Sequence, residues 1–476
     1  MDVIDAIRHH ARLRPNEIAV IQAGGHLNYL QLAGAVAQLA LRQRGHGIAP
    51  GARVAIYVSD PLLHLLLALA AMVNGAATLS AQPGHPPVPA NAGIDVFLAD
   101  RELPFSAGRK TIRVETGWLA ESLKVPPMAL ARTAFRDGQA LCRLYTSSGT
   151  TGRPKVIGQT LGSLVAMTVR SLSTDPVFKG PGLAMMTLAA VGGFGTAHSS
   201  LWHGNTVVLA STPQKVLAAL GLYGVATLRA SPQQLQGLVD WARGQPVRFP
   251  RLERIEVAGA SLPAGLLAAA RATLCTNVVG GYGSTEAGGI AQAPAALLEV
   301  HPDAAGYVRP DVDVRIAGPD GAALPPGQEG IIQVRTPYMN HYVDDPEATA
   351  AGFVDGWFVP GDLGILEAGG VLRITGRADE MINIGGIKLN PQLVDETLLA
   401  LPGVRDAAAF ARRMAGGDQV WAAVVRGEGF DEEAVLAACR SRLGVRAPVR
   451  LQPLAQIPRN AMGKPLRQQL TQQAGG

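Results

Sequence analysis

The chain has 476 residues, of which 47% are hydrophobic and 17% are charged, a composition that excludes a disordered protein. Its length exceeds what one hydrophobic core usually supports, so at least two domains are expected. The formal net charge of +5 comes from 42 basic and 37 acidic residues spread along the chain, which is too diffuse to indicate a nucleic-acid-binding surface.

Neither a disulfide framework nor a membrane anchor is expected. Cys142, Cys275 and Cys439 lie far apart with no paired spacing, which is typical of reduced thiols in a cytoplasmic protein. Residues 1–15 lack the apolar stretch of a signal peptide. The most apolar run, residues 65–73, is far shorter than the roughly 20 residues needed to span a bilayer, so we expect a buried helix there.

The first half of the chain alternates between expected strands and helices. Apolar residues recur at helical spacing over residues 29–45, and a short β-like run at 54–58 precedes a helix at 61–74. The alternation returns with strands at residues 207–210, 226–228, 255–258 and 277–279. This pattern predicts an α/β fold in which helices cover a mostly parallel sheet.

After about residue 305 the alternation of strands and helices gives way to a different pattern. Short strands separated by Gly and Pro are expected within residues 312–318, 330–336 and 356–364, which predicts a small antiparallel subdomain over about 305–376. A polar, charged segment follows Gly376, and a mixed α and β pattern then ends at residue 467. We therefore expect a large N-terminal domain of layered sheets over residues 1–378 and a small α+β domain over 379–476.

The segment YTSSGTTGRPK at residues 145–155 has the composition of a phosphate-binding loop. Glycines let backbone N–H groups approach a phosphate, hydroxyls donate further hydrogen bonds, and Lys155 adds positive charge. It is not a Walker loop, because Gly152 is followed by Arg-Pro instead of Lys-Ser/Thr. By composition alone, an ordinary Ser/Thr/Gly surface turn is the alternative.

Four further motifs follow along the chain. They are GYGSTE at residues 281–286, WFVPGDLG at 357–364, ITGRADEMINIGGIKLNP at 374–391 and IPRNAMGKPLR at 457–467. The last contains Lys464, one of only seven lysines, directly after Gly463, which permits a tight turn. A solvated lysine, and a surface ion pair between Arg377 and Asp379, are the alternatives to functional roles.

In this order the five motifs resemble those of the adenylate-forming superfamily of AMP-binding enzymes, which includes acyl-CoA synthetases, adenylation domains and luciferase-like enzymes. The resemblance implies that Tyr282 stacks near adenine, that Thr285 touches the α-phosphate and that Glu286 binds Mg²⁺. A carboxylate oxygen beside a phosphate is a ligand that Mg²⁺ prefers. The nucleotide- and thiol-binding residues that the resemblance implies are Thr146, Ser147, Ser148, Gly149, Thr150, Thr151, Gly152, Lys155, Gly281, Tyr282, Asp362, Arg377, Gly385 and Gly386.

The resemblance also assigns roles to the C-terminal motifs. Asp362 and Arg377 would bind the ribose, and a carboxylate suits two hydroxyls because it accepts twice. The small, mobile C-terminal domain would swing about a hinge at Asp379. Lys464 would be catalytic in adenylate formation, with Thr285 and Glu286, and Gly385 and Gly386 would then line the tunnel for the thiol.

The acid itself is expected to be apolar. The probable pocket segments, residues 188–201 and 257–290, contain one acidic residue, Glu286, so they offer no partner for the ammonium group of an α-amino acid. The histidine that follows residue 190 in many acyl- and aryl-CoA ligases is absent. Small side chains leave room for an aryl or medium-chain acyl group. The candidate pocket residues are Ala190, Gly193, Phe194, Gly259, Gly283 and Gly288.

We therefore expect an enzyme that uses ATP and Mg²⁺ to activate a small-molecule carboxylic acid to acyl-AMP, with release of pyrophosphate. Transfer of the acyl group to coenzyme A would follow. A stand-alone adenylation enzyme that loads the phosphopantetheine of an acyl carrier protein would use the same residues. A nucleotide-binding protein without catalysis is the remaining alternative, which Lys464, Glu286 and Asp362 disfavour.

Overall fold

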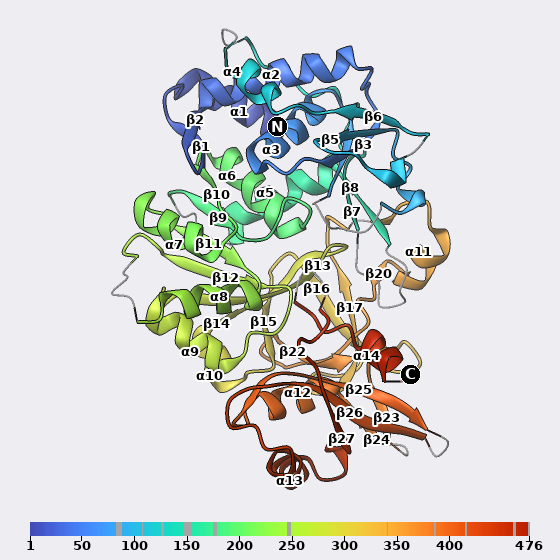
Figure 1. Ribbon diagram of the computed structural model, residues 1–476. Coiled ribbons are helices and arrows are strands. Elements are labelled where there is room, and N and C mark those ends of the chain that lie inside the picture. The colour runs from blue at the N-terminus through green and yellow to red at the C-terminus, as the bar shows by residue number, and fades with distance from the viewer. Residues whose placement is uncertain are drawn as a thin grey trace. The chain divides into compact units, whose positions relative to one another are not determined.

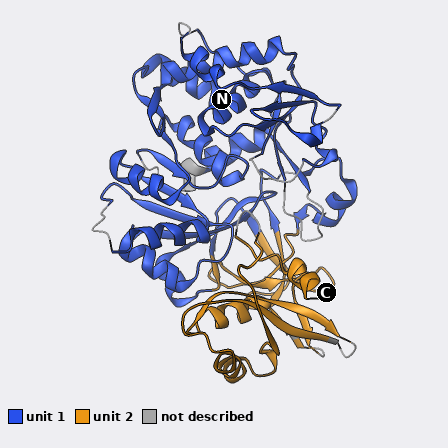
Figure 2. Ribbon diagram, viewed as in Figure 1, with its two compact units in different colours: residues 1–302, 306–313, 334–358 blue, residues 303–305, 314–333, 359–476 orange. Residues whose placement is uncertain are grey.

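The computed structural model describes residues 1–81, 88–106, 108–124, 128–146, 155–174, 179–244, 249–339, 341–384, 387–414, 417–459 and 463–474. The chain divides into two compact units, which Figure 2 shows in different colours. Unit 1 comprises residues 1–302, 306–313 and 334–358, and unit 2 comprises residues 303–305, 314–333 and 359–476. No helix in the described ranges is both long enough and apolar enough to cross a membrane.

One sheet of unit 1 is mainly parallel and carries the strands that flank the phosphate-loop motif. Its strands are β3 (Arg53–Tyr57), β4 (Ala77–Ser80), β5 (Val96–Ala99), β6 (Lys110–Arg113), β7 (Leu141–Thr146), β8 (Val156–Thr160) and β18 (His341–Tyr342). Strands β3 to β7 pair in parallel, whereas β8 pairs antiparallel with both β7 and β18. The strands on either side of the phosphate-loop motif are therefore neighbours in this sheet.

The other sheet of unit 1 contains the strands predicted at 207–210, 226–228, 255–258 and 277–279. Its strands are β1 (Ile18–Gln22), β2 (Gly25–Asn28), β9 (Gly182–Ala184), β10 (Val207–Leu209), β11 (Thr227–Ala230), β12 (Arg254–Ala258), β13 (Val278–Ser284), β14 (Gly288–Pro294) and β15 (Ala304–Val308). The six neighbours β1, β10, β9, β11, β12 and β13 run in parallel, as expected. Strand β2 is an antiparallel edge strand, and β14 pairs antiparallel with both β13 and β15.

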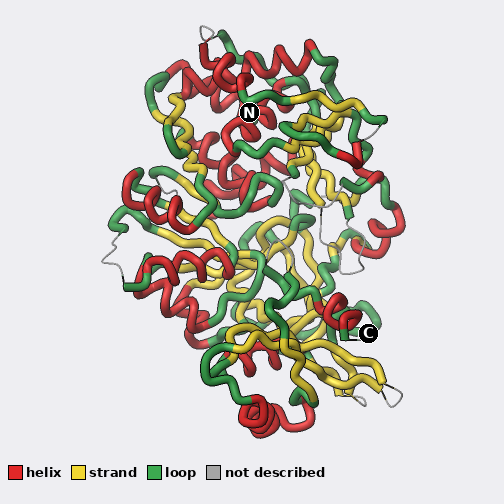
Figure 3. Tube along the Cα trace, viewed as in Figure 1, coloured by secondary structure: helices red, strands yellow, loops and turns green. Residues whose placement is uncertain are grey.

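Helices cover these sheets, as Figures 1 and 3 show. They are α1 (Val3–Leu13), α2 (Tyr29–Gly45), α3 (Pro61–Val73), α4 (Gly117–Lys124), α5 (Leu161–Thr174), α6 (Val191–His203), α7 (Pro213–Leu222), α8 (Pro232–Ala242), α9 (Ala264–Thr273), α10 (Ala295–Val300) and α11 (Pro346–Gly352), and the short strands β19 (Phe353–Val354) and β20 (Trp357–Phe358) follow α11. Helices α1, α2, α3 and α6 share one hydrophobic core, and α7, α8 and α9 share another with β11 and β12.

Side-chain caps mark the first residues of two predicted helices. At the start of α2, the Asn28 side chain accepts from Gln31 and the Gln31 side chain accepts from the Asn28 backbone, which forms a capping box. At the start of α3, Asp60 accepts from the backbone of Leu63, and Pro61 occupies the first turn, where its missing N–H costs nothing. Helix α2 spans the predicted residues 29–45, and α3 ends one residue before the predicted 74.

Unit 2 is built mainly from antiparallel strands. They are β16 (Asp313–Ala317), β17 (Glu329–Arg335), β21 (Asp362–Leu366), β22 (Val371–Arg377), β23 (Ile382–Ile384), β24 (Ile387–Leu389), β25 (Val404–Met414), β26 (Gly417–Arg426) and β27 (Arg450–Pro453), with helices α12 (Pro391–Leu399), α13 (Glu432–Leu443) and α14 (Arg467–Gln473). Strands β17, β21 and β22 pair antiparallel, as the sequence predicted for residues 305–376.

The compact units do not follow the predicted domain bounds. Residues 314–333 and 359–378 fall in unit 2 together with the C-terminal segment, although the sequence predicted that they belong with residues 1–378. Strands β21 and β22 pair antiparallel and therefore fall in the same unit. The composition of this segment does not show whether it belongs with the N-terminal or the C-terminal part of the chain. That Asp379 is the hinge between the two domains stays a prediction.

A fully buried charge lies in the strand that leads to the phosphate loop. Arg143 of β7 has no exposed surface, and its guanidinium donates to the hydroxyls of Thr78 and Ser80 and to the carbonyl of Leu188 at 2.9, 3.2 and 2.7 Å. Its Cζ lies 3.8 Å from the centroid of the Phe194 ring. These contacts join β4 and β7 to the turn that precedes α6 and to the first turn of that helix.

Two buried histidines, His64 and His198, lie close enough to Arg143 to be affected by its charge. Burial, with the charge of Arg143, lowers the pKa of His64 to about 4 and the pKa of His198 to about 3. His64 shares the Ser80 hydroxyl with Arg143, at 2.8 Å from its Nε2. Both imidazoles are therefore neutral near pH 7, and His198 packs in the core without the exposure that a metal ligand or general base needs.

Candidate active site

A carboxylate, a phenol and an ammonium group lie together in unit 1. Glu286 follows the end of β13, is only 8% exposed, and accepts a hydrogen bond of 2.9 Å from the hydroxyl of Tyr342. The Nζ of Lys155 lies 4.7 Å from the centroid of the Tyr342 ring. Strand register explains the meeting, because Tyr342 pairs with Ile157 of β8, two residues after Lys155.

The electrostatics keep Tyr342 in the role of a donor. Burial raises the pKa of the Tyr342 hydroxyl, and the charge and hydrogen bond of Glu286 raise it further. The phenol is therefore protonated over the physiological range and holds the Glu286 carboxylate in one orientation. The sequence did not predict this contact, because Tyr342 lies 56 residues from Glu286 and outside every motif.

This arrangement suits a magnesium–phosphate complex. A buried carboxylate offers the hard oxygen that Mg²⁺ prefers, and a nearby lysine attracts phosphate. Within the described residues, no group of three or more His, Cys, Asp and Glu side chains could hold a metal on its own. The remaining ligands of a metal at Glu286 would then be phosphate oxygens and water, which is how Mg²⁺ is commonly bound.

Part of the predicted nucleotide loop lies outside the described residues. These positions are Ser147, Ser148, Gly149, Thr150, Thr151 and Gly152 in the first motif, and Gly385 and Gly386 in the fourth. Thr146 ends β7 and Lys155 directly precedes β8, so the described residues fix the two ends of the loop on neighbouring strands.

The GYGSTE motif spans the end of β13 and part of the turn that leads to β14. Gly283 lies opposite Gly289, and a Cβ at Gly283 would come within 2.2 Å of the Gly288 carbonyl oxygen, so only glycine fits this close approach. Tyr282 and Thr285 are both half-buried at this turn. The strand end therefore places Tyr282, Thr285 and Glu286 in one short stretch, as the motif predicted.

In unit 2, the two residues predicted to bind ribose lie together. Asp362 begins β21 and pairs with Arg377 at the end of β22, and their side chains form an ion pair of 3.2 Å. Arg377 also donates from Nε to Asp379 at 3.0 Å and from a terminal nitrogen to the Pro360 carbonyl at 3.0 Å. The guanidinium therefore joins the predicted ribose site to the predicted hinge.

Lys464 is exposed and lies on a turn that other side chains hold. Gly463 has a φ of +84°, which confirms the tight turn expected there. Arg459 donates to the Gly463 carbonyl at 2.6 Å and also to Asp406 at 2.6 Å, so this arginine joins the turn to β25. The carbonyl of Gly463, directly before Lys464, is thus held within unit 2.

The candidate acid-pocket residues occupy mixed environments. Ala190 caps the start of α6, where a Cβ at Gly193 would meet the Thr187 carbonyl oxygen at 2.0 Å. Phe194, expected to form a wall, is buried against Arg143. Gly259 follows β12, and Gly288 begins β14 beside Tyr338. Their role in binding the acid, like that of Gly283, stays a prediction.

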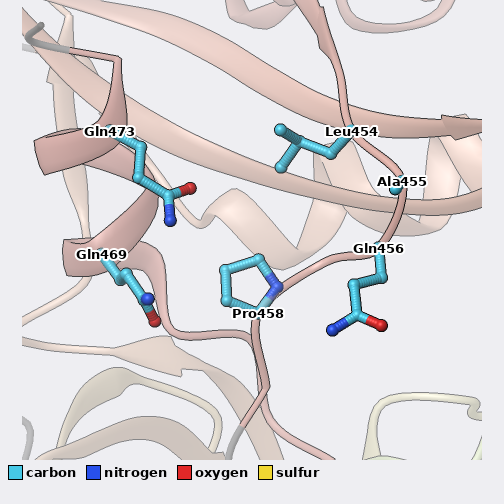
Figure 4. A pocket seen from close by; sticks show the side chains of 6 residues that line it. All are labelled: Leu454, Ala455, Gln456, Pro458, Gln469 and Gln473. Atoms are coloured by element: carbon cyan, nitrogen blue, oxygen red, sulfur yellow. The ribbon is translucent and has the colours of Figure 1, made fainter.

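A pocket of about 290 Å³ lies in unit 2 and is lined by none of the predicted site residues (Figure 4). Its lining comprises Leu454, Ala455, Gln456, Pro458, Gln469 and Gln473. None of these side chains titrates or carries charge, so the pocket offers no group for acid activation.

Comparisons with known proteins agree on one family and one fold. The family described as AMP-binding enzyme matches residues 7–342. A feruloyl-CoA synthase of an Amycolatopsis species is 30% identical over 98% of this chain and 97% of its own length. An indoleacetate–CoA ligase of Aromatoleum aromaticum is also 30% identical, covering 98% of this chain and 96% of its own.

Among solved structures, an o-succinylbenzoate CoA synthetase from Bacillus subtilis, in complex with an acyl-adenylate intermediate, has a TM-score of 0.87. It is 24% identical and covers 98% of this chain and 97% of that chain. This likeness confirms the predicted α/β fold class.

Proposed function

Because the chain belongs to the family of AMP-binding enzymes, we propose that it activates an aromatic carboxylic acid with ATP and Mg²⁺ and transfers the acyl group to coenzyme A. One observation carries the proposal. The buried Glu286 carboxylate, the Tyr342 hydroxyl and Lys155 meet inside the segment that the family matches. Acid–CoA ligase activity agrees with the names of the relatives that cover nearly the whole chain.

In this reaction the protein contributes by positioning the reactants and neutralising charge, and it forms no covalent bond to them. A carboxylate oxygen of the acid attacks the α-phosphorus of ATP, and pyrophosphate leaves. Glu286 would hold Mg²⁺, which neutralises phosphate charge when bound. Lys155 would contact the leaving phosphates, Lys464 would balance charge that develops at the α-phosphate, and Asp362 with Arg377 would hold the ribose.

Relatives named for ferulate and indoleacetate favour an aryl acid over a medium-chain acid. Their names also favour coenzyme A over a carrier protein as the acceptor. The described cysteines Cys142, Cys275 and Cys439 are buried and unpaired, which agrees with the cytoplasmic location that the sequence predicts.

The products test the proposal directly. With Mg²⁺, ATP and an aryl acid, we expect AMP and pyrophosphate, because the loop after β7 lacks the Walker pattern that serves γ-phosphate transfer. Chromatography of the nucleotide products and a pyrophosphate-exchange assay measure this outcome. Release of ADP and phosphate would contradict the proposal.

Replacing Glu286 by glutamine is expected to lower adenylation and to shift its Mg²⁺ dependence to higher concentration. An amide oxygen still coordinates Mg²⁺ but lacks the charge, so high Mg²⁺ should restore part of the rate. The matched control is Tyr342→Phe, which removes the hydrogen bond to Glu286 and keeps the carboxylate. If Glu286→Gln left the Mg²⁺ titration of the initial rate unchanged, Glu286 would not be the metal ligand.

A further inference from the structure

An ion pair absent from every motif lies between the predicted acid pocket and the predicted nucleotide site. Arg229 of β11 and Glu256 of β12 are directly opposite each other on neighbouring parallel strands, and their side chains meet at 2.7 Å. The side chains remain 31% and 20% exposed, so a ligand or water can reach them. Neither residue lies in the segments expected to line the pocket, although Glu256 directly precedes one of them.

Two glycines place the pair between the two predicted sites. A Cβ at Gly192, in the first turn of α6, would lie 3.4 Å from Cδ of Arg229, and Gly192 adjoins the candidate pocket residue Gly193. A Cβ at Gly281 would lie 3.4 Å from Oε1 of Glu256. Parallel sheets bind ligands beyond the carboxyl ends of their strands, and Arg229 is the penultimate residue of β11.

The surroundings keep Glu256 ionised. Burial alone would raise the pKa of the Glu256 carboxyl, but Arg229, Arg254 and Arg309 outweigh burial and lower the pKa. The charges of Arg254 and Arg309 are also shared with Gln292, whose amide oxygen, turned toward them, accepts at 3.1 and 2.7 Å. Glu256 is therefore an acceptor only, and Arg229 beside it is a donor only.

A hydroxyl is the group that matches a donor and an acceptor placed side by side, because it both accepts and donates. A second carboxylate on the substrate would be repelled by the negative charge of Glu256. An apolar substituent would remove water from the pair without replacing its hydrogen bonds. We propose that the aromatic acid carries a hydroxyl group, which Arg229 and Glu256 recognise. This inference rests on the proposed function and specifies the substrate of the same site.

The test compares matched acids in the pyrophosphate-exchange assay. Cinnamate, phenylacetate and benzoate would each be offered unsubstituted and with a ring hydroxyl, methyl or second carboxylate at the ortho, meta and para positions. The wild-type enzyme should prefer one hydroxylated acid over its unsubstituted and methyl analogues by about 10- to 100-fold in kcat/KM, the effect of one hydrogen bond to a charged group. Preference for a methyl or carboxylate analogue would overturn the inference.

Variants show whether the pair causes the preference. Arg229→Met keeps the length of the side chain and should abolish the hydroxyl preference, while kcat/KM for the unsubstituted acid changes little. Glu256→Gln should reduce the preference less, because an amide oxygen still accepts. The control is Arg8→Met, which removes a pair of similar exposure (20% and 29%, 3.0 Å from Asp5) on α1.

The failures are distinguishable. A hydroxyl preference that survives Arg229→Met, or an equal loss for all acids in that variant, overturns the inference while exchange by the wild-type enzyme still supports the proposed function. Absence of exchange with every acid overturns both.

Discussion

Replacing Lys464 by alanine is expected to lower the rate of acyl-AMP formation by about 100- to 1,000-fold, the usual effect of losing one charge aimed at a transition state. Attack of coenzyme A on supplied acyl-adenylate should be nearly unchanged. The reason is the predicted swing of the C-terminal domain, which uses Lys464 in the first step only. Quenched-flow measurement of acyl-AMP and of thioester, made separately, tests both halves.

The control is Lys215→Ala, which removes an exposed lysine on α7 that no motif includes. This variant should retain both rates. Equal loss of both steps in Lys464→Ala, with an unchanged thermal melt, would contradict the prediction that a moving domain separates the two half-reactions.

Replacing Arg143 by alanine is expected to lower the free energy of unfolding by about 3 to 5 kcal/mol, as large-to-small changes in a core do. The change removes a fully buried side chain, leaves a cavity against Phe194, and deprives Thr78, Ser80 and Leu188 of a charged donor. Chemical denaturation followed by circular dichroism measures the loss.

Arg136→Ala is the matched control, because Arg136 is exposed and lies in the same part of the chain. Surface changes of this kind usually stay within about 0.5 kcal/mol. If Arg143→Ala were as stable as this control, the cost of burying the guanidinium would cancel its contacts, and the arginine would serve a purpose other than stability.

The fold was predictable where local signals agree. Helical spacing together with Asn28 and Gln31 defines α2, and β-like runs followed by helical stretches identify β10 to β13. No motif includes Arg143, which lies in β7 just before the phosphate-loop motif. Its partners Thr78 and Leu188 are 65 and 45 residues away, so only tertiary structure reveals that this charge is buried.

The candidate site was predictable where residues are contiguous. The motifs identified Glu286, Lys155, Asp362 and Arg377. In the structure Glu286 and Lys155 both lie against Tyr342, and strand register places Asp362 opposite Arg377. Contacts between segments distant in sequence were not predictable from spacing. The Tyr342 hydrogen bond is one example, since it depends on β18 joining a sheet whose other strands end 182 residues earlier, at Thr160 of β8.

The guanidinium of Arg377, which pairs with both Asp362 and Asp379, should make the predicted hinge sensitive to ionic strength. Arg377 holds both carboxylate oxygens of Asp379, at 3.0 and 3.2 Å, so a backbone rotation at Asp379 would begin by opening this fork. The Asp379 side chain is 40% exposed, and dissolved ions screen an exposed pair far more than a buried one. Salt should therefore ease the first movement of the hinge, and a cell's ionic content would help to set how readily the enzyme passes from one half-reaction to the next.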